Sequence, residues 1–493
     1  MKNKILIFTV ILGFLASGCK KEFLDINKNP NSATTATPEL VLPAALANTA
    51  ARLNPMASPN TWFNGWMGYW AISGSYAIST SDFTTYKQTT TTGDATWQGS
   101  YLNLSNYNFV EVQSKAEGKP FYEGAAKVMK AFNFQMLVDL FGDVPYTEAF
   151  GGTGNIHPKY DDQKFIYDDL IKQLDTAITL MSTPNISGDP NSDILFDGDP
   201  ALWAQFANSL KLRILMRQSQ VADRVAYVQA EIAKIVASDI GFLGEDAGVN
   251  PGYSNSAGKQ NPFYGSNYNV SGTYTNDFWR ANQYGIDFYK KNNDPRLTLV
   301  YGESGTGKYQ GNSIGQISGL VGSDASIFGP GVLKAFDQDA IIMTAAESYF
   351  LQAEAALRGW LTDDAQALYE QGVVASFQTL GVEDFETAAA DYVSQSGNKN
   401  TNWAEAGSFD EKLALIIRQK WAAMNTITPI ETYADYRRLH LPADVPLSIS
   451  PYVETKQVPY RLLYPVSEYR TNTENVNAKG TIDQFTTKIF WIP

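Results

Sequence analysis

The stretch AAKVMKAFNFQMLVDLFGDVP, residues 125–145, does most to decide the fold. Its apolar side chains form two stripes at helical spacing, one of Val128, Ala131, Phe132, Met136 and Leu140 and the other of Phe134, Leu137, Val138 and Phe141. A helix that is apolar on two sides is buried between neighbouring elements. Gly142 and Pro145 follow the stripes, as is typical of a helix end. The stretch therefore predicts a buried helix that ends near Phe141.

Helical periodicity continues on the C-terminal side of this stretch. Residues 167–181 carry a single apolar stripe, which predicts a surface helix. Further stripes predict a helix from Pro200 with Asp199 as its cap, a helix over residues 225–235, and a late helix after Asp410. Most of the chain is therefore expected to be α-helical.

Residues 342–380 predict a helical hairpin. An apolar stripe runs from Ile342 to Leu357, and Thr362 is placed to cap a second helix that continues to about residue 380. Ala365, Tyr369 and Gly372 have the spacing found in the second helix of a tetratricopeptide repeat. No strict period of about 34 residues is visible, so the hairpin is repeat-like only. The fold class predicted is mostly α, with repeat-like helix pairs, little β structure, and long aromatic loops at residues 54–100 and 244–335.

The first residues predict export. A basic start is followed by an apolar run at residues 5–15 and then by Ala16, Ser17, Gly18 and Cys19, which is the layout of a secretory signal. The run is about half of the ~20 residues that a spanning helix needs. Leu-Ala-Ser-Gly before the single cysteine resembles a lipobox, so lipidation is predicted at Cys19. The domains expected are a signal peptide (1–18), a lipidated tether (19–38) and a helical body (39–493), attached to a membrane by lipid only.

Composition restricts the possible partners. The net charge of −13 argues against binding to nucleic acid. With only two histidines, His157 and His440, and no ligand spacing around them, no cofactor and no histidine metal site are expected. The acidic residues Asp189, Asp193, Asp197 and Asp199 lack EF-hand spacing, so a solvated loop is favoured there, with a loose Ca²⁺ site as the alternative. The adjacent Arg437 and Arg438 are expected to bind helix ends or carboxylates rather than substrate.

Several blocks of the chain, taken in order, resemble one family. The chain resembles the SusD/RagB-type outer-membrane lipoproteins of the Bacteroidetes, and within them a SusD-like subgroup with a Lys-Trp pair on a late helix. The blocks that carry the resemblance are Cys19–Asp25 (CKKEFLD), residues 125–145, residues 347–359 (ESYFLQAEAALRG), Gln419-Lys420-Trp421, residues 433–438 (YADYRR) and residues 464–475.

The resemblance implies a fold, a location and a partner. It implies a mostly helical fold with four repeat-like helix pairs and a position on the outer membrane facing the exterior. It also implies partnership with a SusC-like TonB-dependent transporter, to which the lipoprotein delivers a nutrient, usually a glycan. On this basis the protein is expected not to be an enzyme.

Two aromatic clusters are candidates for ligand binding, because sugars stack their C–H faces on aromatic rings. The first consists of Trp62, Trp66, Tyr69 and Trp70, which would share one face at helical spacing. Its alternative interpretation is core packing. The second lies in residues 261–280, has no helical or strand periodicity, and consists of Phe263, Tyr264, Tyr268, Tyr274 and Trp279.

Two other functions remain open from the residues alone. A surface glycan-processing enzyme needs two carboxylates at a defined separation, and no motif nominates a pair among the 51 acidic residues. A repeat-type adaptor would bind only protein. The sequence does not identify the ligand.

Overall fold

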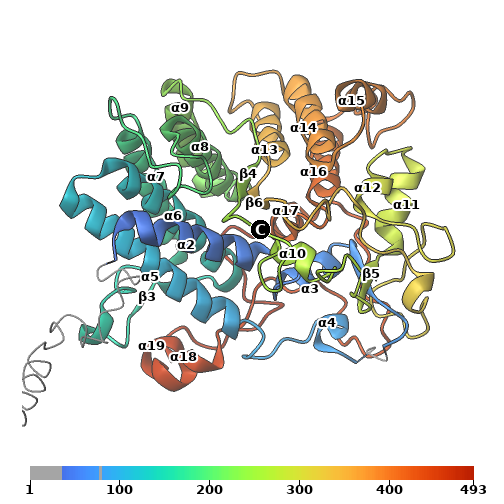
Figure 1. Cartoon of the computed structure of the whole chain (residues 1–493), viewed down its shortest axis with the longest axis horizontal. Helices are drawn as coiled ribbons and strands as arrows, with labels where there is room; N and C mark the ends of the chain where they lie inside the picture. The colour runs from blue at the N-terminus through green and yellow to red at the C-terminus, as the bar shows by residue number, and fades with distance from the viewer. Residues whose placement is uncertain (1–35, 77–79) are drawn as a thin grey trace, which may run out of the picture. The chain divides into compact units, whose positions relative to one another are not determined.

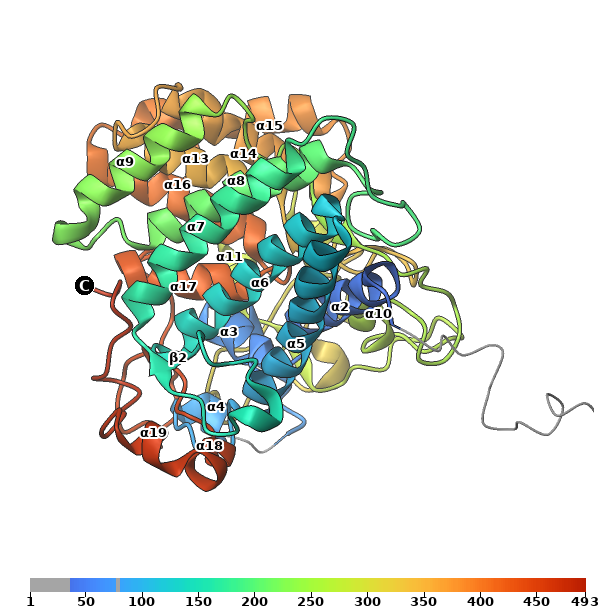
Figure 2. The same cartoon turned by 90° about the vertical axis from the view of Figure 1, so that its left-hand side faces the viewer.

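Residues 125–141 belong to helix α6 (Pro120–Phe141), and every residue from Ala131 to Phe141 is buried. The computed structural model describes residues 36–76 and 80–493. Helix α6 packs against α5 (Asp94–Glu117), α7 (Gln163–Met181), α8 (Pro200–Arg217) and α2 (Pro38–Leu53) (Figure 2). Gly142 ends the helix at a positive φ of 78°, where a side chain would be strained. The predicted buried helix and its end are confirmed.

The remaining helices complete a mostly helical unit that spans Pro38–Pro493 (Figure 1). The longer ones are α9 (Val225–Ala237), α13 (Ala345–Leu357), α14 (Ala365–Leu380), α16 (Phe409–Met424) and α17 (Pro429–Leu439). The shorter ones are α3 (Asn60–Trp66), α4 (Asp82–Thr85), α10 (Pro262–Gly265), α11 (Gln283–Lys291), α12 (Leu297–Val300), α15 (Phe385–Val393), α18 (Val466–Thr471) and α19 (Thr473–Asn477). Single 3-10 turns lie at Gly152–Gly154, Ala222–Arg224, Gly322–Asp324 and Trp403–Glu405.

Helices that are neighbours along the chain pack together, among them α5 with α6, α7 with α8, α13 with α14, and α16 with α17. The helices predicted at residues 167–181, 200 onwards, 225–235 and after Asp410 are all present. Asp199 caps α8 by accepting hydrogen bonds from the N–H groups of Ala201 and Leu202. The mostly α fold class is confirmed.

Strand structure is confined to three short antiparallel pairs in the part of the chain that the structure describes. They are β1 (Trp70–Ile72) with β5 (Trp279–Ala281), β2 (Val144–Pro145) with β3 (Tyr160–Asp161), and β4 (Ala247–Val249) with β6 (Ala340–Met343). The β1–β5 pair places Trp70 opposite Ala281 and Ile72 opposite Trp279. It therefore joins the two aromatic clusters of the sequence at one place in the fold.

The predicted helical hairpin is formed by α13 and α14. Gly372 of α14 faces the ring of Phe350 on α13 so closely that an added Cβ would lie 2.7 Å from it. The small residue in the repeat-like pattern is thus required for the close approach of the two helices. Two details of the prediction are wrong. Asp364, not Thr362, caps α14, and Ile342 lies in β6 before the first helix begins.

Candidate functional site

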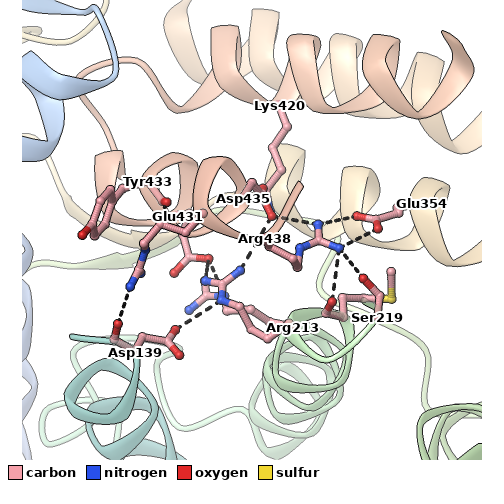
Figure 3. Close-up of polar contacts among 12 residues, drawn as sticks. Asp139, Arg213, Ser219, Glu354, Lys420, Glu431, Tyr433, Asp435 and Arg438 are labelled. Carbon is pink, nitrogen blue, oxygen red and sulfur yellow. Dashed lines mark hydrogen bonds and ion pairs between the residues drawn. The ribbon is translucent and has the colours of Figure 1, made fainter. Parts of the chain in front are cut away.

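Ten charged side chains are buried together where α6, α8, α13, α16 and α17 meet, and Figure 3 labels part of this group. None of these residues is more than 3 % exposed, and their formal charges cancel. The cations are Arg213, Arg217, Lys420, Arg437 and Arg438, and the carboxylates are Asp139, Glu347, Glu354, Glu431 and Asp435. We call this group the buried ion cluster.

The buried ion cluster is held by paired contacts of good geometry. Arg213 binds both oxygens of Glu347 at 2.7 and 2.9 Å, and Arg438 binds both oxygens of Glu354 at 2.6 and 2.7 Å. Figure 3 also shows Arg438 reaching Asp435, at 2.8 Å. Bidentate pairs of this kind are the strong form of an ion pair.

Arg437 makes a different contact, since it donates to the backbone carbonyls of Asp139 at 2.6 Å and Tyr460 at 2.9 Å. Asp139 lies in the last turn of α6. The prediction that Arg437 and Arg438 bind helix ends or carboxylates is confirmed.

Electrostatics keep Glu431 and Asp435 of the cluster ionised. Burial alone would raise the pKa of Glu431, but attraction to Arg213, Arg217 and Lys420 outweighs it and holds the pKa at about 2. The same balance lowers the pKa of Asp435, which lies beside Lys420 and Arg438. A carboxylate that acts as a general acid or base must reach a substrate, and these do not. The cluster therefore stabilises the helix packing.

Clusters of side chains that could bind a metal ion are absent from residues 36–76 and 80–493. These ranges contain no group of three or more His, Cys, Asp or Glu side chains that could hold an ion.

The first predicted aromatic cluster is mainly core. Helix α3 ends at Trp66, so Tyr69 and Trp70 do not continue its face, and the predicted helical spacing is wrong. Trp66, Tyr69 and Trp70 have no exposed surface. Trp66 donates to the Phe83 carbonyl at 3.1 Å, Tyr69 to the Trp421 carbonyl at 2.6 Å, and Trp70 to the Thr426 hydroxyl at 2.8 Å. The prediction that these three rings bind ligand is therefore wrong, because packing uses all of their surface.

Trp62 differs from its neighbours in this cluster. It is half-buried, and its ring lies 5.5 Å from that of Trp66. Trp62 stays a predicted ligand contact.

The second predicted cluster has two buried residues, Phe263 and Trp279, and three residues that are partly exposed. Phe263 and Trp279 are 6 % and 8 % exposed, and both rings lie against Trp70, at 6.2 and 5.8 Å between centroids. They anchor the segment 261–280 to the core, which leaves Trp279 little surface for a ligand, while Phe263 also lines the cavity described below.

Tyr264, Tyr268 and Tyr274 form the surface part, and we call them the tyrosine cluster. All three are half-buried. The rings of Tyr264 and Tyr268 stack at 4.8 Å between centroids with a 22° tilt, and Tyr274 meets Tyr268 edge-on at 5.2 Å. Their geometry leaves aromatic surface next to polar side chains at the edge of one hairpin-like turn.

Local hydrogen bonds hold the tyrosine cluster in place. The side chain of Asn261 accepts from the N–H groups of Phe263 and Tyr264 and begins α10. Tyr268 and Tyr274 are paired through their backbones, and the Asn269 side chain closes the turn between them. Burial raises the pKa of both Tyr268 and Tyr274, so their phenols stay neutral at physiological pH. Neutral rings on a fixed turn suit stacking rather than acid–base chemistry.

A further aromatic pair was not predicted as a site. Tyr76 is 38 % exposed, and its ring lies 4.8 Å from that of Phe278, which belongs to the same segment as the tyrosine cluster. The density of aromatic residues in segment 261–280 is the signal that would have found Phe278.

A comparison with protein families shows which family this chain belongs to. The family model described as "Starch-binding associating with outer membrane", SusD-like, matches residues 30–465. This chain belongs to the SusD-like family. The family resemblance predicted from the sequence is confirmed, and so is the helical fold that it implies. A comparison with curated proteins gives no match.

Solved structures of SusD homologues share the fold of this SusD-like chain. A chitin-binding SusD homologue from Flavobacterium johnsoniae is 24 % identical with a TM-score of 0.76, over 91 % of this chain and 98 % of that one. A SusD-like protein from Bacteroides thetaiotaomicron is 24 % identical with a TM-score of 0.74, over 91 % and 98 %. A SusD homologue from Bacteroides fragilis is 21 % identical with a TM-score of 0.72, over 93 % and 99 %.

The blocks that carry the resemblance have clear places in this SusD-like fold. Residues 125–145 form most of the buried helix α6, and residues 433–438 supply Asp435, Arg437 and Arg438 to the buried ion cluster. Lys420 of the Lys-Trp pair joins that cluster, 2.9 Å from Asp435. In residues 36–76 and 80–493, no helix is long and apolar enough to span a bilayer.

Proposed function

We propose that this protein is a lipoprotein that binds a glycan at the outer face of the outer membrane and delivers it to a SusC-like TonB-dependent transporter. The family description supports starch binding and association with the outer membrane. One of the related structures is described as chitin-binding, which supports a glycan as the ligand class. The net charge of −13 supports a partner other than nucleic acid.

The anchor in this proposal is a lipid on Cys19 after removal of residues 1–18. Cys19 and the predicted signal peptide lie outside the described residues, as does most of the predicted tether 19–38. The basic, apolar and small-residue order before the single cysteine supports the proposal.

The tyrosine cluster carries the binding part of the proposal. Sugars present apolar C–H faces and hydroxyls, and Tyr264 and Tyr268 offer partly exposed rings on a turn anchored by Phe263 and Trp279. Tyr274 supports Tyr268 edge-on, with its own hydroxyl buried. We propose that the protein acts by binding alone, without catalysis or a cofactor. The carboxylates of the buried ion cluster are engaged in ion pairs, which supports this view.

Replacing Tyr264 and Tyr268 together by alanine is expected to weaken binding of a glycan at least tenfold, because both stacking surfaces are lost. A tenfold change corresponds to about 1.4 kcal/mol, within reach of two aromatic contacts. The measurement is isothermal titration of the full-length protein in mild detergent with maltohexaose and with N-acetylchitohexaose.

The matched control for this change is Tyr452→Ala, since Tyr452 is an exposed tyrosine (56 %) in another segment. We expect it to bind like the unmodified protein. Unchanged affinity in the Tyr264→Ala, Tyr268→Ala variant, with circular dichroism also unchanged, would contradict the tyrosine cluster as the site.

The partner is tested by purification from the native membrane. A C-terminal tag and mild detergent are expected to recover a large β-barrel receptor in an amount comparable to the lipoprotein, identified by mass spectrometry. Recovery of the lipoprotein alone, or with unrelated proteins, would contradict the transporter partnership.

A further inference from the structure

A cavity of about 330 Å³ is lined in part by Asn261, Pro262 and Phe263, the residues that begin α10. Its apolar walls include Leu53 at the end of α2, Phe263 of α10, Val332, and Ile341 of β6. Ligand sites in proteins have volumes of roughly 300–1,000 Å³, so this one is at the small end of the range. It suits one ring of a ligand rather than an extended chain.

Three charged side chains line the cavity with unused hydrogen-bonding capacity. Asp246 accepts one bond at each oxygen, from the Ala345 N–H at 2.9 Å and the Thr379 hydroxyl at 2.8 Å, which leaves a lone pair on each. Asp339 is exposed and accepts from Asn250 at Oδ1, at 2.9 Å, while its Oδ2 accepts nothing from residues 36–76 and 80–493. The cavity therefore presents several acceptors to a ligand.

Lys334 supplies the one positively charged group of the lining. Its exposed ammonium makes no hydrogen bond or ion pair among the described residues, although its charge acts on Asp246. Burial raises the pKa of Asp246, while the bonds from Ala345 and Thr379 and the charge of Lys334 act against that rise.

Two other side chains of the lining, Asn261 and Gln338, are bonded within the framework. The Asn261 amide donates to the Gln338 carbonyl at 2.9 Å, and the Gln338 side chain accepts from the Lys334 N–H at 2.7 Å. They fix the lining instead of facing a ligand. What remains is a small space with apolar walls, carboxylate acceptors, one ammonium and the side-chain NH2 of Asn54.

From this lining we infer that the cavity binds the terminal sugar ring of an uncharged glycan. The inference rests on the proposed function and names a second binding site for it. Hydroxyl groups are the donors that carboxylate oxygens need, and the apolar walls match the C–H faces of a sugar ring. Two carboxylates against one ammonium disfavour a sugar that carries a carboxylate or sulfate.

Helix α10 connects this cavity to the tyrosine cluster. Phe263 lines the cavity and lies against Trp70, while the next residue, Tyr264, stacks on Tyr268. A glycan held on the tyrosines thus has a site for a chain end nearby. The two sites are separable by mutation, since they share no exposed side chain.

The test uses methyl α-glucoside, methyl N-acetyl-β-glucosaminide and methyl glucuronide as probes of one ring each. Saturation-transfer NMR with the full-length protein in detergent measures their binding. At least one neutral probe is expected to bind the unmodified protein and the Tyr264→Ala, Tyr268→Ala variant equally. Its affinity is expected to fall at least tenfold in Asp339→Ala and in the cavity-filling variant Ala340→Phe, and methyl glucuronide is expected to bind at least tenfold more weakly.

Asp337→Ala is the matched control, because Asp337 is an exposed acid two residues from Asp339 and does not line the cavity. It is expected to bind the neutral probe normally. The inference is overturned if no neutral probe binds, if binding survives both Asp339→Ala and Ala340→Phe, or if methyl glucuronide binds as well as the neutral probes.

Failure of this inference and failure of the proposed function give different results. If neither hexasaccharide binds the unmodified protein, the proposed function fails. If a hexasaccharide binds through the tyrosine cluster while the single-ring probes do not bind, only the cavity inference fails.

Discussion

Replacing Arg438 by methionine is expected to lower the free energy of unfolding by about 3–5 kcal/mol. Arg438 is 1 % exposed and bonds to both oxygens of Glu354, to Asp435, to the Met216 carbonyl and to the Ser219 hydroxyl. Methionine has a similar length but no charge and no donors. The loss arises mainly because Glu354 and Asp435 stay buried with fewer partners, not because one attraction is removed.

Urea unfolding of the full-length protein, followed by circular dichroism, measures this loss. Lys399→Met is the control, because Lys399 forms an ion pair of similar length with Glu411, at 2.6 Å, but is 65 % exposed. An exposed pair contributes about 0–1 kcal/mol. We therefore expect the two variants to differ by several kilocalories per mole, although each removes a single cation.

A second variant separates charge from packing. Glu354→Gln added to Arg438→Met removes one of the charges that lost a partner, so the double variant is expected to lose less stability than the sum of the two single changes. Simple additivity, or a loss below 1 kcal/mol for Arg438→Met, would show that the buried ion cluster does not hold the helices together.

The sequence was most informative where a helix is buried on all sides by apolar residues. Helix α6 was predicted with its end because its apolar residues repeat at helical spacing and Gly142 follows. Helix α5 (Asp94–Glu117) was not predicted, and its first residues fall in the stretch 54–100 that was taken as loop. Its buried positions include Ser100, Asn103 and Ser114, which break the apolar stripe although the structure buries them.

The candidate site could be predicted only in part, because composition does not separate a packed ring from an exposed one. Trp70 and Tyr268 both lie in aromatic-rich segments, yet one has no exposed surface and the other is half-buried. The difference depends on the β1–β5 pair, which brings Trp279 against Trp70 from a distant part of the chain. Pairing of distant segments leaves no local pattern in a sequence.

The buried ion cluster could not be predicted as a group from the sequence. Its members come from five helices, and each is an ordinary charged residue at its own place in the chain. Only the adjacent pair Arg437 and Arg438 indicated contacts to helix ends or carboxylates. The cancellation of charge that makes the burial stable exists only in the folded protein.

Replacing Trp421 by alanine is expected to lower the free energy of unfolding by about 3–5 kcal/mol, because it opens a large cavity in the core. Trp421 of α16 is 1 % exposed, and its ring lies 5.0 Å from that of Tyr69 and 5.1 Å from that of Phe288 on α11. Its indole N–H donates to the Met67 carbonyl at 2.9 Å. One side chain thus joins a late helix to α11 and to the residues just before β1.

Trp421→Phe is the graded control, since it keeps an aromatic ring and loses the indole N–H. Leaving the buried Met67 carbonyl unpaired costs about 1–3 kcal/mol, so this variant is expected to lie between alanine and the unmodified protein in urea unfolding. The order of the three stabilities separates the contribution of ring volume from that of the hydrogen bond.

The same comparison tests how the aromatic segments are supported. Residues 67–72 lead from the Trp421 contact into β1, and β1 pairs with β5, which ends the segment that carries the tyrosine cluster. If Trp421→Ala lost less than 1 kcal/mol, the support for that segment would have to come from its other core contacts, Phe263 and Trp279 against Trp70. A large loss that Trp421→Phe mostly restores would instead assign the support to ring packing between α16, α11 and the turn before β1.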